Sequence, residues 1–217
     1  TPAAAWLQAQ GFTVFELIYR LPNDGWDAAA PFMDAQRAMK IIRTRAGEFG
    51  VAPDKLGILG FSAGGHLAGF TAYQPARPLY AGTDRYEAAS ARPDFAVLLF
   101  PVVTLRKPYD TTRTRREIIG DKATTKAEDE WSLDTYAAKD APPTIIFASA
   151  DDPTTPPGHG ILLFQTLVAA GASAELHLFR DGGHGWGLGK PEQVISQWPA
   201  LFAHWAQSLK IIEKRGE

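Results

Sequence analysis

The feature that most constrains the fold is residues 60–66 (GFSAGGH), in which a glycine-flanked serine separates an apolar run from a helical pattern. The apolar run is residues 55–59 (KLGIL), which are typical of a short buried strand. The sequence therefore predicts a strand, a sharp turn carrying Ser62, and a helix. We expect Gly60 and Gly64 to be required, because a Cβ at either position would collide with the neighbouring strand or helix.

Such a turn would expose the Ser62 hydroxyl and place the Ala63 backbone N–H at a helix N-terminus, which favours developing negative charge. The G-x-S-x-G pattern between strand and helix is that of a nucleophile elbow, with Ser62 as nucleophile and Ala63 N–H in the oxyanion hole. The alternative interpretation is a glycine-rich packing turn.

Apolar runs alternate with helical patterns along the rest of the chain. Continuous apolar strands between helices predict an α/β fold with a mostly parallel sheet covered by helices on both faces. All 217 residues are predicted to form one domain, 1–217, in which the polar segment 104–140 is a cap-like insertion of short helices over the site. Strands are predicted over 12–19, 55–59, 95–103, 144–149 and 174–179, and helices over 2–10, 29–49, 159–170 and 199–212.

Three polar residues follow predicted strands: Ser62, Asp152 and His184. Ligands gather at the carboxyl ends of parallel strands, so these side chains are expected on one rim. A serine nucleophile needs an oriented base, and a carboxylate must hold that base. His184 lies in residues 181–186 (DGGHGW), a glycine-rich loop that would let the imidazole lean over the rim.

The carboxylate could be Asp151 or Asp152. We favour Asp152 because it stands directly before the turn at residues 153–156 (PTTP), and Asp151 would then be a helix-capping or supporting carboxylate. The remaining histidines are expected to have structural roles: His66 in packing or hydrogen bonding, His159 in capping or at the surface, His177 in a strand and His204 on the last helix.

Several short motifs occur in order along nearly the whole chain: residues 19–22 (YRLP), 34–38 (DAQRA), 60–68 (GFSAGGHLA), 142–144 (PPT), 150–152 (ADD), 175–179 (ELHLF) and 182–185 (GGHG). Together they resemble the acetyl xylan esterase-like carbohydrate esterases of the α/β-hydrolase superfamily. The resemblance implies a metal-independent serine esterase, without a cofactor, that removes acetyl or other short acyl groups from sugars or xylan-type polysaccharides. It implies Ser62 as nucleophile, Asp152 as acid and His184 as base.

Trp186 directly follows the candidate base. It could wall the acyl pocket or stack on a sugar face, which makes it a substrate-binding candidate. The alternative is a core tryptophan.

The chain departs from this family in two places. Members usually carry Val-Pro after the acid, where this chain has Thr155 and Pro156. They also carry two or three strands before the first helix, and a glycine-rich loop that supplies a second oxyanion donor. Upstream of Gly25 this chain has only Gly11. We therefore expect that this chain is a fragment of a longer protein and that its N-terminal strands are missing. The missing loop matters for activity as well, because loss of one oxyanion donor lowers turnover by about 100- to 1000-fold.

Composition and charge limit the kinds of binding partner and chemistry that we expect. A net charge of −2 gives no reason to expect nucleic acid or an anionic membrane, and no apolar run approaches the roughly 18 residues of a membrane span. The absence of cysteine excludes disulfides, thiolate metal sites and a cysteine nucleophile. The expected partner is a small ester or acetylated carbohydrate.

Two alternatives to the short-acyl esterase stay open. One is another serine hydrolase on the same fold, either a lipase-like esterase or a peptidase. The other is an inactive or binding fragment. The sequence leaves the oligomeric state and the compartment open, with a secreted or periplasmic location among the alternatives because any leader would lie upstream.

Overall fold

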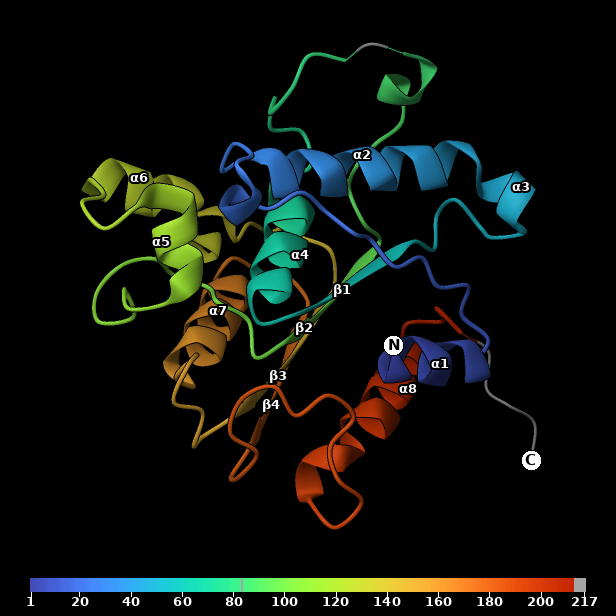
Figure 1. Cartoon of the computed structure of the whole chain (residues 1–217). Coiled ribbons are helices and arrows are strands. Elements are labelled where there is room, and N and C mark those ends of the chain that lie inside the picture. The colour runs from blue at the N-terminus through green and yellow to red at the C-terminus, as the bar shows by residue number, and fades with distance from the viewer. Residues whose placement is uncertain (83, 213–217) are drawn as a thin grey trace.

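A four-stranded parallel sheet forms the centre of the molecule (Figure 1). The structure, a computed structural model, describes residues 1–82 and 84–212, so residue 83 and the last five residues of the predicted domain lie outside the described residues. Each strand pairs in parallel with the next along the chain. In order they are β1 (Gly57–Phe61), β2 (Phe95–Leu99), β3 (Thr144–Ser149) and β4 (Ala174–Phe179).

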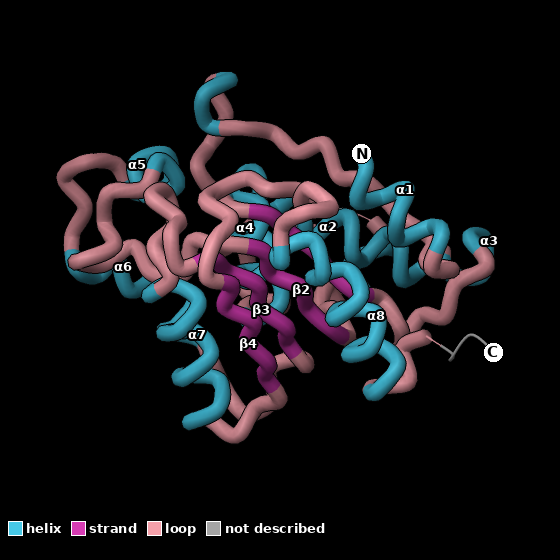
Figure 2. The backbone as a smooth tube through the Cα atoms, turned by 90° about the horizontal axis from the view of Figure 1, so that it is seen from below, coloured by secondary structure: helices cyan, strands magenta, loops and turns pink. Residues whose placement is uncertain are grey.

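Helices cover both faces of this sheet (Figures 1 and 2). One face is covered by α2 (Ala30–Thr44), α4 (Ala63–Tyr73) and α7 (Gly158–Ala169), and the other by α1 (Pro2–Ala9) and α8 (Trp198–Ser208). Successive strand residues point to opposite faces, so Leu98 packs in the first core and Val97 in the second. Both are fully buried. The predicted α/β sheet with helices on both faces is confirmed.

The other helices are short. Helices α5 (Arg113–Ile119) and α6 (Thr125–Trp131) lie together at one end of the sheet, within the polar segment 104–140 (Figure 1). None of the helices in the described ranges is long and apolar enough to cross a membrane. The remaining elements are α3 (Ala46–Phe49) and the 3-10 turns η1 (Pro22–Asp24), η2 (Arg85–Ala88), η3 (Leu133–Tyr136) and η4 (Val194–Gln197).

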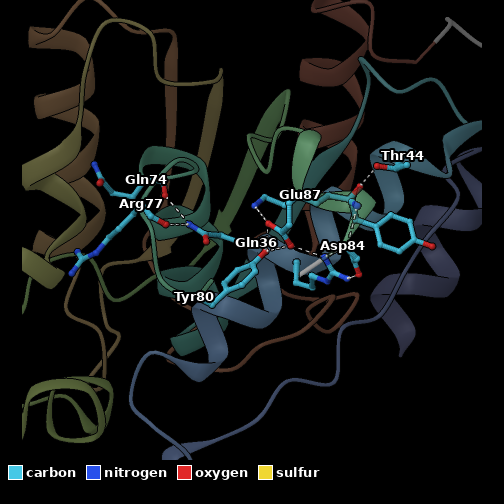
Figure 3. A network of polar contacts seen from close by, with 10 residues as sticks. Gln36, Thr44, Gln74, Arg77, Tyr80, Asp84 and Glu87 are labelled. Carbon is cyan, nitrogen blue, oxygen red and sulfur yellow. Dashed lines mark hydrogen bonds and ion pairs between the residues drawn. The ribbon is translucent and has the colours of Figure 1, made fainter. Parts of the chain in front are cut away.

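The long loop between α4 and β2 is fastened to α2 by polar side chains (Figure 3). The Gln36 amide donates to the backbone oxygens of Gln74, at 3.0 Å, and Arg77, at 3.2 Å. Glu87 on η2 accepts a hydrogen bond from the Arg37 guanidinium of α2 at 2.5 Å. These contacts set the path of the chain from the helix after Ser62 to the central strand β2.

The strand predicted over residues 12–19 is wrong, because this segment is extended but forms no strand ladder. Its apolar side chains remain partly or fully outside the core: Phe15 and Leu17 are 42% and 41% exposed, and Ile18 is 98% exposed. An extended run becomes a strand only when a neighbouring strand takes its backbone hydrogen bonds. Within the described residues, the segment has no such neighbour.

Other predicted boundaries move by a few residues. The helix predicted over 29–49 is interrupted at Arg45 and continues as α3. The strand predicted over 95–103 ends at Leu99, because Phe100 adopts a φ of 37° and Pro101 follows it. The closing helix ends at Ser208 rather than residue 212.

Candidate active site

Ser62 occupies a strained turn between β1 and α4, with a φ of 54° that non-glycine residues rarely adopt. A Cβ at Gly60 would lie 2.0 Å from the Gly64 carbonyl oxygen, so glycine is required there. The same expectation for Gly64 is wrong, since a Cβ at that position would meet nothing within 4 Å. The second crowded position is Gly65, where a Cβ would lie 3.0 Å from Pro101 Cα.

The structure brings Ser62, His184 and Asp152 together. The Ser62 Oγ lies 2.9 Å from His184 Nε2, and His184 Nδ1 lies 2.7 Å from Asp152 Oδ2. A carboxylate can only accept, so Nδ1 carries the imidazole proton and Nε2 is left as an acceptor for the serine hydroxyl. This arrangement can move a proton from a serine to an imidazole that a buried carboxylate orients.

The two neighbouring aspartates have different surroundings. The Asp152 side chain is fully buried, and its Oδ1 accepts the backbone N–H groups of Thr154 at 2.8 Å and Thr155 at 2.9 Å. Asp151 is exposed and accepts the Gly183 N–H at 2.8 Å. That N–H bond holds the pKa of the Asp151 carboxyl below its usual range. Asp151 therefore fastens the loop of His184, whereas Asp152 contacts the imidazole itself.

Phe100 packs against the imidazole from the end of β2. Its ring lies edge-on to the His184 ring, with centroids 4.7 Å apart, and its backbone N–H donates to the Phe147 oxygen at 2.7 Å. The positive φ of Phe100 is a second strained position beside the site. The strain turns the chain away from the sheet and places an aromatic ring against His184.

A cavity of about 410 Å³ opens beside Ser62. Ala63, the first residue of α4, is among its lining residues, and its N–H belongs to the first turn, where backbone donors lack intrahelical partners. Phe32 of α2 forms an apolar part of the wall. The segment 104–140 also contributes to this wall, through Thr112 and Glu117 at helix α5.

Trp186 lies in a cluster of aromatic side chains. Its ring centroid is 4.7 Å from that of Phe100, 6.4 Å from Trp198 and 6.5 Å from Phe179. The described residues that line the cavity do not include Trp186. These contacts favour the interpretation of Trp186 as a core tryptophan that supports Phe100, and its substrate-binding role stays a prediction.

Two other histidines are buried close to the site. His66 is fully buried, and its Nδ1 lies 3.1 Å from the Val102 carbonyl oxygen, which confirms a hydrogen-bonding role. The expectation of a capping or surface role for His159 is wrong, because it is 1% exposed and its Nδ1 accepts the Val103 N–H at 3.1 Å. Burial lowers the pKa of each imidazole to about 4. Elsewhere, His177 contacts Glu175 at 2.6 Å and His204 is exposed on α8.

The sheet order and the turn that carries Ser62 define the fold as that of the α/β-hydrolases. Solved structures of esterases agree with this class. The acetyl ester-xyloside bifunctional hydrolase from Caldicellulosiruptor lactoaceticus superimposes with a TM-score of 0.89 at 29% identity, covering 98% of this chain and 77% of that one. Propionate-bound esterase Est2 from Thermogutta terrifontis gives a TM-score of 0.84 at 26% identity, covering 99% and 78%.

The chain belongs to the BD-FAE family, whose model matches residues 2–167. It is similar to an acetylxylan esterase from Xylanibacter ruminicola, at 27% identity over 95% of this chain, and to endo-1,4-beta-xylanase B from Butyrivibrio fibrisolvens, at 28% over 77%. The matches span 41% and 26% of those two relatives. The resemblance to acetyl xylan esterase-like α/β-hydrolases predicted from the sequence motifs is confirmed.

Two residues of the site were not identified from the sequence. Thr155 contacts the Asp152 carboxylate, and Phe100 contacts the His184 ring. The signal for Thr155 was its position in place of the usual valine after the acid. The signal for Phe100 was Pro101, since a proline beside an apolar run marks the end of a central strand.

Proposed function

We propose that this chain is a serine esterase that hydrolyses acetyl or other short acyl esters on sugars or xylan-type polysaccharides. Ser62 is the nucleophile, His184 the general base and Asp152 the carboxylate that orients it. The observation that carries the proposal is the continuous line of polar contacts from Ser62 Oγ to His184 Nε2, at 2.9 Å, and from His184 Nδ1 to Asp152 Oδ2, at 2.7 Å.

The reaction has two acyl-transfer steps. Ser62 Oγ attacks the ester carbonyl carbon while its proton passes to His184 Nε2, and the Ala63 N–H stabilises the resulting oxyanion. The tetrahedral intermediate expels the sugar alcohol, which takes the proton from His184, and leaves an acyl-serine. Water then attacks the acyl group with His184 again as base, which releases the carboxylic acid and restores Ser62.

The relatives and the cavity support the choice of substrate. One similar curated protein is an acetylxylan esterase, and one similar solved structure is an acetyl ester-xyloside bifunctional hydrolase. A cavity of about 410 Å³ is larger than an acetyl group needs, so it has room for part of a sugar as well. Because α5 contributes to the cavity wall, we infer that residues 104–140 act as a cap that shapes substrate entry.

The test compares wild type with Ser62→Ala on p-nitrophenyl acetate, longer p-nitrophenyl esters and acetylated xylan. Loss of the nucleophile should lower kcat by about 10⁶-fold, down to the limit set by background hydrolysis. Ser208→Ala is the matched control, because Ser208 is exposed at the end of α8, and it should keep full activity. Equal rates for wild type and Ser62→Ala on every ester would falsify the proposal.

A second readout does not need the natural substrate. Esterase 2 from Thermogutta terrifontis has been solved phosphorylated by paraoxon. Treating this protein with paraoxon should add one diethylphosphoryl group to the peptide that contains Ser62, as measured by mass spectrometry. The Ser62→Ala variant should gain no such mass.

The series of p-nitrophenyl esters tests the acyl specificity. A steep fall in kcat/KM with acyl length would support the short-acyl substrate, whereas a preference for long acyl chains would favour the lipase-like alternative.

A further inference from the structure

Thr155 is a buried threonine whose hydroxyl lies among three polar groups of the site. The residue is 3% exposed. Its Oγ1 lies 2.8 Å from Asp152 Oδ2, 3.2 Å from His184 Nδ1 and 3.2 Å from the Phe100 carbonyl oxygen. A hydroxyl has one proton to donate and can accept from others. The proton therefore has two competing acceptors, the Asp152 carboxylate and the Phe100 carbonyl.

The shorter contact and the charge both favour the carboxylate. Hydrogen bonds to an ionised acceptor are shorter and about twice as strong as those between neutral groups. Asp152 Oδ1 already accepts two backbone N–H groups, and Oδ2 accepts His184 Nδ1–H. With the Thr155 hydroxyl as a fourth donor, every favourable acceptor position of this fully buried carboxylate is used. A buried carboxylate with a missing donor would be less well held and less stable as an ion.

We propose that Thr155 is a positioning residue for the esterase reaction, acting by donating its hydroxyl proton to Asp152 Oδ2 and thereby holding that oxygen in line with His184 Nδ1. This inference rests on the proposed function. It concerns a residue at which the chain departs from the valine usual in the family it resembles. The backbone N–H groups of Thr154 and Thr155 fix only Oδ1. The hydroxyl is the donor, besides the imidazole itself, that fixes Oδ2.

Two substitutions separate the hydroxyl from the methyl group. Thr155→Val keeps the branched shape and removes the hydroxyl, whereas Thr155→Ser keeps the hydroxyl and removes the methyl group. We expect Thr155→Val to lower kcat on p-nitrophenyl acetate about tenfold with little change in KM, the size expected for one hydrogen bond to a charged group. Thr155→Ser should keep most of the activity. A fall in the serine variant alone would assign Thr155 a packing role and overturn the proposal.

The second measurement is the proton resonance of His184 Nδ1–H at low field, which reports on its hydrogen bond to Asp152 and needs no catalysis. In Thr155→Val, Oδ2 is no longer held in line with His184 Nδ1, so the hydrogen bond should weaken and this resonance should move upfield. In Thr155→Ser it should stay close to its wild-type position. An unchanged resonance and unchanged kcat in Thr155→Val would overturn the role of Thr155. The proposed esterase function would survive that result, because it depends on the loss of activity in Ser62→Ala.

Discussion

Two apolar segments of this chain look alike in sequence and differ in structure. Strand β2, Phe95–Leu99, lies between two other strands, and all five of its residues are buried. Residues 12–19 (FTVFELIY) are as rich in aromatic and branched side chains, yet they form no strand, and Ile18 is 98% exposed. Apolar character therefore does not by itself make a strand in this protein.

The two segments differ in the hydrogen-bond partners of their backbone groups. Backbone groups of β2 are paired on both sides, by β1 and by β3. Residues 12–21 are instead held by scattered contacts, such as the stacking of Phe12 on Phe202 and the bidentate ion pair of Arg20 with Asp34. A site that requires distances fixed to a few tenths of an ångström is best built on the paired segment. The candidate active site follows β1, β3 and β4, and Phe100 extends it from β2.

Among the changes that test this comparison, the largest effect is expected at the turn after β3, in the paired region. Asp152→Asn should lower kcat by about 10³- to 10⁴-fold, because an amide can donate to Nδ1 and hold the imidazole in the wrong tautomer. Asp151→Asn should leave kcat close to the wild-type value, since Asp151 only accepts the Gly183 N–H and an amide oxygen can do the same. Both variants are assayed on p-nitrophenyl acetate after their circular dichroism spectra are matched to wild type.

The outcome separates two views of the adjacent carboxylates. If Asp151→Asn were the inactive variant and Asp152→Asn active, the base would be oriented by the exposed carboxylate, and the contacts of Asp152 would be structural. Equal losses would indicate that the loop of His184 must be fastened and oriented by both residues.

Local signals in the sequence were enough to predict many of the elements and residues that form the candidate active site. The G-x-S-x-G turn, the apolar runs that became β2, β3 and β4, and the placement of Asp152 and His184 after strands all depend on residues close together in the chain. The distances among Ser62, Asp152 and His184 needed the structure, because they depend on the parallel register of the sheet.

Other features could not be predicted because they depend on distant neighbours. Residues 12–19 have strand-like composition, but whether they pair is decided by which strand lies beside them. His159 resembles a helix-capping residue in sequence, and its burial against Val103 results from how α7 packs on the sheet. The crowding of Gly65 by Pro101 arises in the same way.

A second prediction compares the two apolar segments by stability. Leu98→Ala should lower the free energy of unfolding by about 2–5 kcal/mol, because Leu98 is fully buried and the substitution leaves a cavity. Ile18→Ala should change it by less than about 0.5 kcal/mol, since this side chain is 98% exposed. Urea unfolding at pH 7 measures both. A large loss in Ile18→Ala would mean that residues 12–19 have a partner in solution, which would remove the contrast between the segments.

The smallest expected effect concerns His66, a titratable side chain that is fully buried on α4. Burial lowers the pKa of His66 from 6.5 to about 4, so the unfolded chain binds a proton between these values and the folded chain does not. The stability contributed by neutral His66 is therefore fully present above pH 6.5 and is lost as the pH falls toward 4. Between pH 7 and pH 5 the loss should be about 2 kcal/mol.

The prediction is tested by the difference between variants, because other groups also titrate in this range. His66→Asn keeps an amide N–H for the Val102 carbonyl and removes the titrating imidazole. The loss of stability between pH 7 and pH 5 should then be about 2 kcal/mol smaller than in wild type. His204→Asn, at an exposed position on α8, is the matched control for the replacement of a histidine by asparagine. If His66→Asn and wild type lost the same stability, the imidazole would be protonated in the folded protein. A charged imidazole on α4 would have to be solvated. The surroundings of α4 would then be closer to the exposed surroundings of residues 12–19 than the structure indicates.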